Sequence, residues 1–400
     1  MVINKFRLKQ QNDSMMKRAA IAAVLCIAFA GCSLLGSNKT KPAALADLKN
    51  NDLAVAWSSN VGASTFGVVK SLIFGKPANY VYSPAIADKL LYIATHSNGI
   101  HVLSEEGGKT VSKIDTKVSL TGGIGLGENL LTVASSKGEI LAFDFAGRTR
   151  WKSEVGGEIL AAPVLVAANL IVRTADGRIF ALNRADGKRK WVFQRATPAL
   201  TLRTSASVIV RGGTLYAGYA GGKVIAIEAE SGKPTWEATI STPRGSTELE
   251  RVADVAGVPA LDDSRICAAV YQGRTGCVET LNGNVLWSRE ISSADGVAID
   301  TKYLYVVDTE GNVYALDKSS GATVWKQDKL QRREPGTPLA IKGKLLIGDA
   351  TGLVHLLSPE NGELIGRVNT DGSEVIALLA TGDRAIAQTA KGGVFSLSIK

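Results

Sequence analysis

The chain has 400 residues and a formal net charge of +9, with 4 cysteines and 3 histidines. A chain of this length would ordinarily form two or three domains. It contains no basic run with interleaved aromatic residues, so the charge does not indicate nucleic-acid binding and we expect no nucleic-acid partner.

The N-terminal residues have the pattern of a signal peptide. A charged region begins at Met15, Met16, Lys17 and Arg18, and residues 19–28 form an apolar stretch that is too short to span a bilayer. The signal is complete from Met15 or Met16, so we expect translation to start at one of these two residues.

Residues 29–32, Phe-Ala-Gly-Cys, resemble a bacterial lipobox, although Phe29 stands where leucine is usual. The resemblance implies cleavage before Cys32 and acylation of that cysteine. We therefore expect a signal peptide over residues 1–31 and a lipid anchor at Cys32; an ordinary signal peptide with a chance cysteine is the alternative. By resemblance to the lipoprotein sorting rule, Ser33 in place of aspartate favours the outer membrane.

Removal of the signal changes the charge of the mature chain. Residues 1–31 carry five basic side chains and one acidic side chain, so the net charge falls from +9 to +5, which is mild for this length. Residues 32–52 are mostly small and polar and predict a lipidated tether rather than part of the folded domain.

Residues 53–400 repeat one short phrase. It reads GNVYALDKSSGATVW at 311–325, and close copies occur at 177–191 and 222–236. Counted from the leading glycine of the phrase, a second glycine lies 10 residues later and a tryptophan lies 14 residues later. The apolar run predicts a strand and the Asp and Ser-Gly positions are typical of a turn, so each phrase predicts a β-hairpin.

Eight copies of the phrase are present in varying completeness. Their leading glycines lie at 99, 138, 177, 222, 273, 311, 352 and 392. A second strand precedes every leading glycine, and a further apolar segment precedes most of those strands. Units of about 40 residues built only from strands are typical of β-propellers. The sequence therefore predicts an all-β fold, an eight-bladed β-propeller of four-stranded antiparallel blades over residues 53–400.

The two ends of the repeat region predict how the ring closes. The last copy, GGVFSLSIK at 392–400, stops after its third strand, whereas AVAWSSNVG at 54–62 carries Trp57 without a hairpin before it. We expect the segment around Trp57 to supply the missing outer strand, so that no blade is left incomplete. All six tryptophans would then share one position, which we interpret as packing between blades rather than a cofactor site.

The sequence shows little sign of catalysis. The third histidine is His355. His96 and His101 flank one hairpin turn without a third ligand, so we interpret them as polar turn residues, with a metal site as the alternative. The stretch TGGIGLGEN at 121–129 looks suited to phosphate, but it leads into a strand instead of a helix and is better explained as a blade connection. We expect no catalytic residues, no metal and no cofactor.

The blade phrase resembles the repeats of pyrroloquinoline-quinone dehydrogenases. This resemblance implies the alternative function, a propeller enzyme of the periplasm. Those enzymes are generally longer, carry a disulfide between adjacent cysteines and bind calcium through acidic ligands. In this chain no two cysteines are adjacent.

Cys267 and Cys277 remain once Cys26 leaves with the signal and Cys32 takes lipid. A three-residue loop at 271–273 with glycine last predicts a type I turn with a bulge, which places Cys267 opposite Cys277. Directly opposed residues are close enough for a disulfide, and we predict that bond. The alternative is a pair of small buried thiols.

Two connections between blades are longer than the repeat requires. They are RATPALTLRTSASV at 195–208, the first loop, and TPRGSTELERVADVAGVPA at 242–260, the second loop. Both join an outer strand to the next inner strand, so both should lie on one face. Leu200 and Leu202 beside Arg203 predict a small protein-docking patch rimmed by charges. The alternative is that the leucines pack under their own loop.

The lipobox, the closed eight-bladed ring and these loops together resemble the BamB family, the lipoproteins of the outer-membrane β-barrel assembly machinery. The specific motifs are Pro198-x-Leu200-x-Leu202-Arg203 and Gly245-Ser246-Thr247-Glu248-Leu249-x-Arg251-x-x-Asp254-Val255. In the family these loops meet the periplasmic POTRA region of the barrel insertase BamA. The resemblance implies partner-binding roles for Leu200, Leu202, Arg203 and Asp254, while Ala256 stands where the family often has a second acid.

The sequence thus predicts a lipoprotein on the periplasmic face of the outer membrane. It would be a non-enzymatic scaffold that docks on BamA, joins the other Bam components and aids insertion of outer-membrane proteins. A further hypothesis is that a blade edge holds unfolded client strands by β-augmentation.

Overall fold

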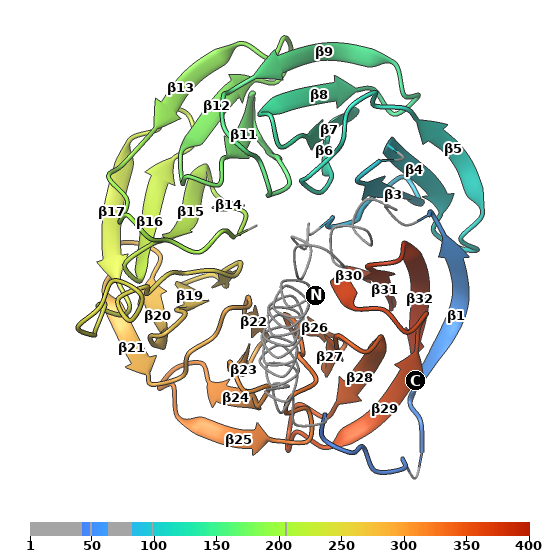
Figure 1. The fold of residues 1–400 in the computed structure, drawn as a ribbon, viewed down its shortest axis with the longest axis vertical. Coiled ribbons are helices and arrows are strands. Elements are labelled where there is room, and N and C mark those ends of the chain that lie inside the picture. The colour runs from blue at the N-terminus through green and yellow to red at the C-terminus, as the bar shows by residue number, and fades with distance from the viewer. Residues whose placement is uncertain (1–41, 49, 63–81, 98, 205) are drawn as a thin grey trace, which may run out of the picture. The chain divides into compact units, whose positions relative to one another are not determined.

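The fold is an eight-bladed β-propeller, as predicted (Figure 1). The computed structural model describes residues 42–48, 50–62, 82–97, 99–204 and 206–400. These residues form eight four-stranded sheets, and all pairings within them are antiparallel. In the described ranges no helix is long and apolar enough to cross a membrane.

The first four blades follow one another in chain order, each running from an inner to an outer strand. They comprise β2 (Ala85–Ala87), β3 (Leu90–Thr95), β4 (Gly99–Ser104) and β5 (Thr110–Ile114); β6 (Gly125–Gly127), β7 (Leu130–Ala134), β8 (Glu139–Phe143) and β9 (Thr149–Glu154); β10 (Val164–Val166), β11 (Asn169–Arg173), β12 (Ile179–Asn183) and β13 (Arg189–Phe193); and β14 (Ile209–Arg211), β15 (Thr214–Tyr219), β16 (Lys223–Glu228) and β17 (Pro234–Thr239).

The next three blades repeat this order. They comprise β18 (Ala260–Leu261), β19 (Arg265–Ala269), β20 (Thr275–Glu279) and β21 (Val285–Arg289); β22 (Ala298–Ile299), β23 (Tyr303–Val307), β24 (Val313–Asp317) and β25 (Thr323–Gln327); and β26 (Leu339–Ile341), β27 (Lys344–Gly348), β28 (Leu353–Leu357) and β29 (Leu364–Asn369). Blade two contains β6, which lies within TGGIGLGEN, so this stretch supplies an inner strand and its connection, as expected.

Blade eight joins the two ends of the domain. It contains β30 (Val375–Thr381), β31 (Arg384–Thr389) and β32 (Gly393–Ile399), and its outer strand is β1 (Leu53–Asn60) from the start of the chain. β1 runs antiparallel to β32, with Leu53 opposite Ile399 and Asn60 opposite Gly393. The predicted ring closure is therefore confirmed, and Figure 1 shows the blue strand β1 along the outside of the red blade.

The six tryptophans share one position at the boundaries between blades, as predicted. Each indole Nε1–H donates to a backbone carbonyl of the following blade, at 2.7–3.3 Å. Each ring also lies against the second glycine of that blade's phrase, where an added Cβ would come within 2.3–2.6 Å of ring carbons. The glycine and the tryptophan of the phrase thus form one contact that is repeated around the ring.

Two blades lack the tryptophan, and other residues fill its place. In blade seven the equivalent residue is Gly366, and Leu53 of β1 packs there, 2.9 Å from where a Cβ would lie. In blade one, Ile114 of β5 fills the place of the tryptophan ring. A Cβ added to Gly147 of the next blade would lie 2.9 Å from its side chain. The inter-blade seam is therefore apolar even where the repeat departs from its pattern.

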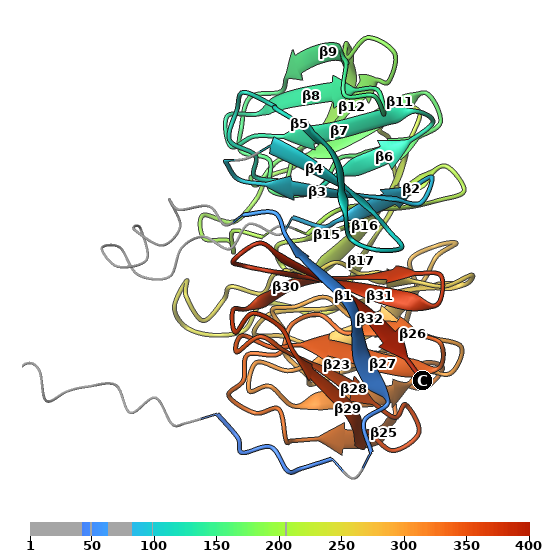
Figure 2. The ribbon, with the colours of Figure 1, turned by 90° about the vertical axis from the view of Figure 1, so that its right-hand side faces the viewer.

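Residues 42–48 and 50–52 form no strand but are held against blades six and seven (Figure 2). Ala43 donates to the carbonyl of Gln331 at 3.2 Å and accepts from the buried Arg333 guanidinium at 3.1 Å. Farther along, the side chain of Asn51 donates to the carbonyl of Arg367 at 2.8 Å. This part of the expected tether is thus fixed to the propeller by bonds to its backbone and to one side chain.

Candidate functional site

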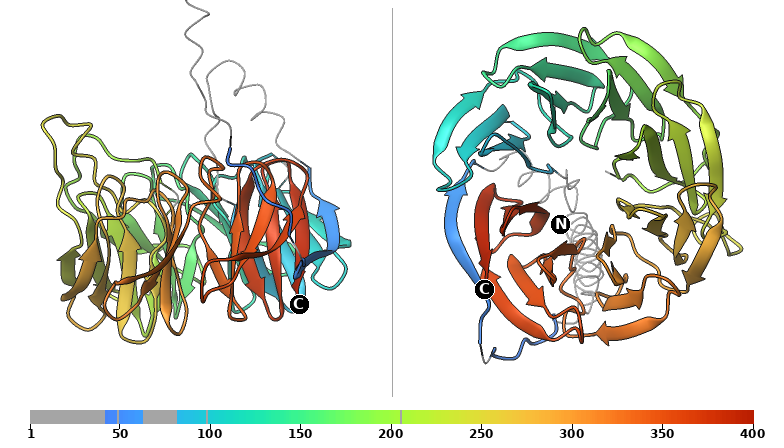
Figure 3. Two further views of the ribbon diagram at one scale, coloured as in Figure 1. Left: turned by 90° about the horizontal axis from the view of Figure 1, so that it is seen from below. Right: turned by 180° about the vertical axis from the view of Figure 1, so that it is seen from behind.

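The two long loops lie on one face of the ring because both connect an outer strand to the next inner strand. The first loop links β13 to β14 and the second links β17 to β18. Figure 3 shows the connections of these olive-coloured blades extending from one side of the propeller. Their bases are adjacent, since they flank blade four.

Hydrogen bonds join the two loops directly. The backbone N–H of Leu202 donates to Oδ2 of Asp254 at 2.6 Å, and the hydroxyl of Thr204 donates to the carbonyl of Ala256 at 2.6 Å. These bonds span more than fifty residues of sequence, and each uses a backbone atom on one side. The second loop therefore sets the backbone conformation of the first at Leu202.

Asp254 is buried, with 3% of its surface exposed. Its backbone carbonyl accepts from the N–H of Tyr271 at 2.9 Å. Burial raises the pKa of the Asp254 carboxyl, and hydrogen bonds from the backbone of Leu202 and Gly221 oppose that shift. The Asp254 side chain is therefore buried between the two loops, which we call the loop junction. It holds the backbone of Leu202 there and does not project from the surface.

The leucines and Arg203 differ in exposure. Leu200 is 44% exposed, and Leu202 is partly buried beside the loop junction. The Arg203 guanidinium forms a two-bond ion pair with Glu158, from Nε to Oε2 at 2.9 Å and from Nη2 to Oε1 at 2.6 Å. The carboxylate of this pair comes from Glu158, while that of Asp254 accepts the backbone N–H of Leu202.

Glu158 was not identified from the sequence. It lies between β9 and β10, in a connection of ordinary length on the same face as the two loops. The two loops could be identified because their length departs from the repeat. The connection that contains Glu158 has the usual length and gives no such signal. Its only sequence signal is an acidic side chain in an otherwise small and apolar stretch, VGGEILAAP.

The aromatic side chain of Tyr219 and two arginines, Arg173 and Arg195, support the base of the first loop. The guanidinium carbons of Arg173 and Arg195 lie 5.0 and 5.4 Å from the ring centre of Tyr219, which is 3% exposed. Burial raises the pKa of Tyr219 to about 12, so the phenol stays neutral. Arg173 also donates to the carbonyl of Ala206 at 3.1 Å, which ties the end of the loop to blade three.

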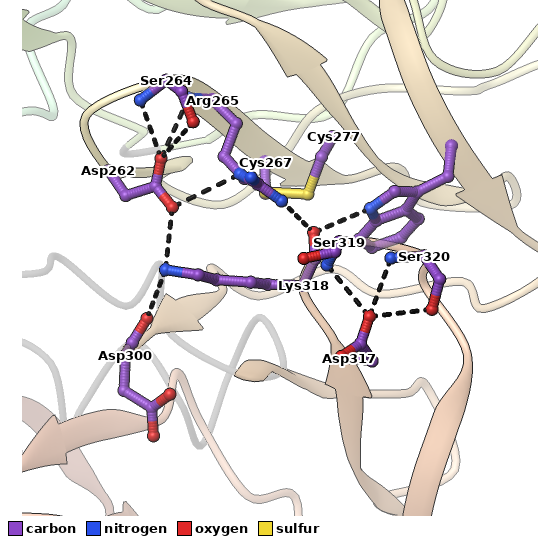
Figure 4. Close-up of a disulfide and its surroundings, with 11 residues drawn as sticks. Asp262, Ser264, Arg265, Cys267, Cys277, Asp300, Asp317, Lys318, Ser319 and Ser320 are labelled. Atoms are coloured by element: carbon purple, nitrogen blue, oxygen red, sulfur yellow. Dashed lines mark hydrogen bonds and ion pairs between the residues drawn. A yellow bond between two sulfur atoms is a disulfide. The ribbon is translucent and has the colours of Figure 1, made fainter. Parts of the chain in front are cut away.

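The predicted disulfide is present in blade five (Figure 4). Cys267 of β19 lies directly opposite Cys277 of β20, with 4.0 Å between the Cα atoms, and both residues are fully buried. The turn differs in one respect, because Gln272 rather than Gly273 adopts the left-handed conformation, at φ 49°. The register survives because Val270 still bonds to Arg274, at 3.1 Å.

A cavity of about 440 Å³ lies on the propeller axis. Most of its lining residues belong to the connections that lead into the inner strands, and they include Asp295 and Glu374. Burial and the neighbouring charge of Glu374 raise the pKa of Asp295 to about 6.

The histidines do not gather at this cavity or at the loops. His96 bonds through Nδ1 to the carbonyl of Leu120 at 2.8 Å, and His355 is buried against Asp349 at 3.0 Å. Among the residues that the structure describes, no three His, Cys, Asp or Glu side chains are placed to hold a metal ion. Cys32 and the lipobox lie outside the described residues.

Comparison with known proteins identifies the family. A model of the family described as "Outer membrane protein assembly factor BamB" matches residues 96–327 and 320–400. The chain belongs to the BamB family. A BamB relative from Nitrosomonas eutropha is 39% identical over 322 residues, covering 80% of this chain and 79% of the relative. The BamB of Burkholderia pseudomallei is 32% identical over 389 residues, covering 96% and 98%.

Solved structures agree with the fold. The crystal structure of BamB from Moraxella catarrhalis has a TM-score of 0.77 at 24% identity, and the match covers 87% of this chain and all of that one. A quinohemoprotein alcohol dehydrogenase from Comamonas testosteroni gives 0.69 at 14% identity, covering 89% and 78%. At these identities both likenesses show the fold alone.

Proposed function

We propose that this BamB-family chain is a non-catalytic scaffold lipoprotein of the outer-membrane β-barrel assembly machinery. It is anchored through Cys32 on the periplasmic face of the outer membrane. It docks on the POTRA region of BamA, associates with the other Bam components and aids the folding and insertion of outer-membrane proteins.

The observation that carries this proposal is the joined pair of loops. A half-exposed leucine, Leu200, projects beside Arg203 from a loop whose backbone is held by Asp254. Pre-ordered loops lose less conformational entropy on binding than mobile ones, so a small patch can still dock with useful affinity. The naming of many relatives as outer membrane protein assembly factors supports the same role.

The roles of the four family positions differ in this proposal. Leu200 and Leu202 supply apolar contact, which salt does not screen. Arg203 supplies hydrogen bonds, and Asp254 maintains the loop that presents the other three. Binding of unfolded client strands at a blade edge stays a prediction, to be tested with strand-forming peptides.

A pull-down of BamA tests the proposal. The variant carries Leu200→Ala, Leu202→Ala and Arg203→Ala together, and circular dichroism and thermal unfolding confirm its fold. The control is Leu281→Ala, because Leu281 is 84% exposed but lies in the turn between β20 and β21, on the other face. We expect the triple variant to lose BamA and the control to retain it. Retention of BamA by the folded triple variant would contradict the proposal.

A further inference from the structure

The segment before β1 begins at the face of the ring that carries the first and second loops. Gln331 and Arg333 lie between β25 and β26, in a connection of the same kind as those two loops, from an outer strand to the next inner strand. Ala43 donates to the carbonyl of Gln331 at 3.2 Å, and its own carbonyl accepts from Nη1 of Arg333 at 3.1 Å. The chain at Ala43 is therefore held at this loop-bearing face.

At its other end the segment has reached the opposite face. The N–H of Asp52 donates to the carbonyl of Ile365 at 3.1 Å, and the carbonyl of Asp52 accepts from the N–H of Lys400 at 2.9 Å. Outer strands such as β29 run toward the loop-bearing face and third strands such as β32 run away from it, so the start of β29 and the end of β32 both lie at the opposite face. Figure 2 shows the blue segment crossing from one side of the ring to the other before β1 begins. We call residues 43–48 and 50–52 the strap.

The ring itself holds the groups that receive the strap. The Arg333 guanidinium is buried, and its Nε and Nη2 donate to Asp349 at 2.7 Å and to Thr351 at 2.8 Å. These bonds fix the direction of Nη1, which donates to the strap. Leu45 of the strap adds an apolar contact, because it packs against the core cluster of blades six and seven. Binding to donors that are already fixed loses less entropy than binding to mobile ones.

The strap changes both the reach of a lipid anchor and the face from which it leaves. Leu53, the first residue of β1, is 21 residues from Cys32, whereas Ala43 is 11 residues from it. An extended chain spans at most about 3.6 Å per residue, so the two lengths allow about 75 Å and about 40 Å. Without the strap the anchor would leave from Leu53 at the opposite face. With it, the anchor leaves from Ala43 at the loop-bearing face.

We propose that the strap makes the lipidated chain leave the propeller at the loop-bearing face, and so keeps the edge of this face at Ala43 within about 40 Å of the membrane. The inference rests on the proposed lipid anchor at Cys32 and concerns the orientation of the ring, not its docking contacts. A ring that cannot turn its loops away from the membrane presents them to a membrane-embedded partner at a higher effective concentration. Release of the strap would let either face approach the membrane.

Substitutions in the strap test whether it is held. Leu45 and Leu48 are half-buried, whereas Ala44 and Ala46 are exposed. Leu45→Asp with Leu48→Asp should release the strap, because a charged side chain is costly against an apolar surface. The control is Ala44→Asp with Ala46→Asp, which adds the same charge at exposed positions. Hydrogen–deuterium exchange of the peptide over residues 43–52 in the lipidated chain should be about tenfold faster or more in the first variant and unchanged in the control.

Energy transfer to the membrane tests the orientation. Lys329 follows β25 and Ser319 precedes it, so Lys329→Cys and Ser319→Cys place a fluorophore at exposed positions on opposite faces of blade six. The disulfide of Cys267 and Cys277 is buried and does not compete for the label. The lipidated protein is placed in vesicles of phosphatidylethanolamine and phosphatidylglycerol that contain an acceptor-labelled lipid.

With the native strap, we expect transfer from the Lys329 position to be about twofold more efficient or greater than transfer from the Ser319 position, because the short anchor leaves from the face of Lys329. In the variant with both leucines replaced, this difference should disappear. Thermal unfolding establishes that the variant keeps the folded propeller.

Equal transfer from the two positions in the native chain would overturn the inference, as would a difference that persists after the strap is released. Fast exchange of the strap peptide in the native chain would also overturn it. Mass spectrometry of Cys32 separates these results from a failure of the proposed function. If Cys32 carries no lipid, the proposed anchor fails and the inference fails with it. If the lipidated chain gives equal transfer, only the role of the strap is wrong and the proposed docking function is unaffected.

Discussion

Gly321→Ala should destabilise the propeller far more than an ordinary substitution in a turn. Gly321 has φ 69°, and a Cβ there would lie 2.4 Å from Cε3 and 2.5 Å from Cδ2 of Trp287. The indole would have to move, which endangers its hydrogen bond to Lys318 at 3.0 Å. A non-glycine residue in this conformation costs about 1–2 kcal/mol, the overpacking about 1–3 and the hydrogen bond about 0.5–1.5.

The expected loss is therefore about 2.5–6.5 kcal/mol. Gly343→Ala is the matched control, because Gly343 has φ 63° and a Cβ there would meet nothing within 4 Å. It should lose only the conformational part, about 1–2 kcal/mol. Urea unfolding of the mature chain, followed by circular dichroism, measures both losses as shifts of the midpoint at constant slope.

Equal losses in the two variants would refute the contact between glycine and tryptophan as the basis of the repeat. A double variant provides a second check. If the clash is with the indole, Gly321→Ala should cost less in a Trp287→Leu background than alone, so the two substitutions should not be additive. Strict additivity would show that the strain lies elsewhere in the turn.

Three further outcomes are expected. Cys32→Ala should abolish acylation, seen by mass spectrometry, and release the protein from the membrane fraction; native protein without lipid would contradict this. Replacing Cys267 and Cys277 together by alanine should cost about 2–3 kcal/mol in urea unfolding for a disulfide that closes a short loop, and no loss would contradict it. Asp295 has a pKa of about 6 in the folded chain, so its stabilising contribution is present below about pH 4 and lost as the pH rises through about 6. Asp295→Asn should therefore raise stability at pH 7.5 by about 1–3 kcal/mol and flatten the pH dependence between 4 and 6; an unchanged pH profile would contradict it.

The blades were predictable because their key contact between a glycine and a tryptophan is repeated at six of the blade boundaries. The glycine and the tryptophan recur at fixed offsets in most of the blades, so the spacing is visible in a single sequence. The disulfide was predictable for a related reason. Cys267 and Cys277 flank one short hairpin, and a count outward from the turn fixes the register even though the left-handed residue is Gln272.

The proposed docking surface was only partly predictable, because each of its contacts occurs once and joins different blades. Leu200 and Arg203 were found through the unusual length and composition of the first loop. The burial of Asp254 and the pairing of Arg203 with Glu158, 45 residues away, depend on how neighbouring blades are juxtaposed. No periodicity marks such a pair, and its partner residue lies in a connection of normal length.

The course of residues 42–52 illustrates the same limit in another form. Residues 42–48 and 50–52 form no strand, and the sequence there has no regular alternation of apolar and polar residues. The segment is nevertheless fixed to blades six and seven, mainly by its backbone, through the carbonyl of Ala43 and the N–H of Asp52, which donates to Ile365 at 3.1 Å. Every residue type except proline offers these same backbone groups, so such contacts leave no pattern in the sequence. The position of the segment is set instead by its partner, the buried Arg333. The Nε–H of Arg333 donates to Asp349 at 2.7 Å, and its Nη1–H donates to the carbonyl of Ala43.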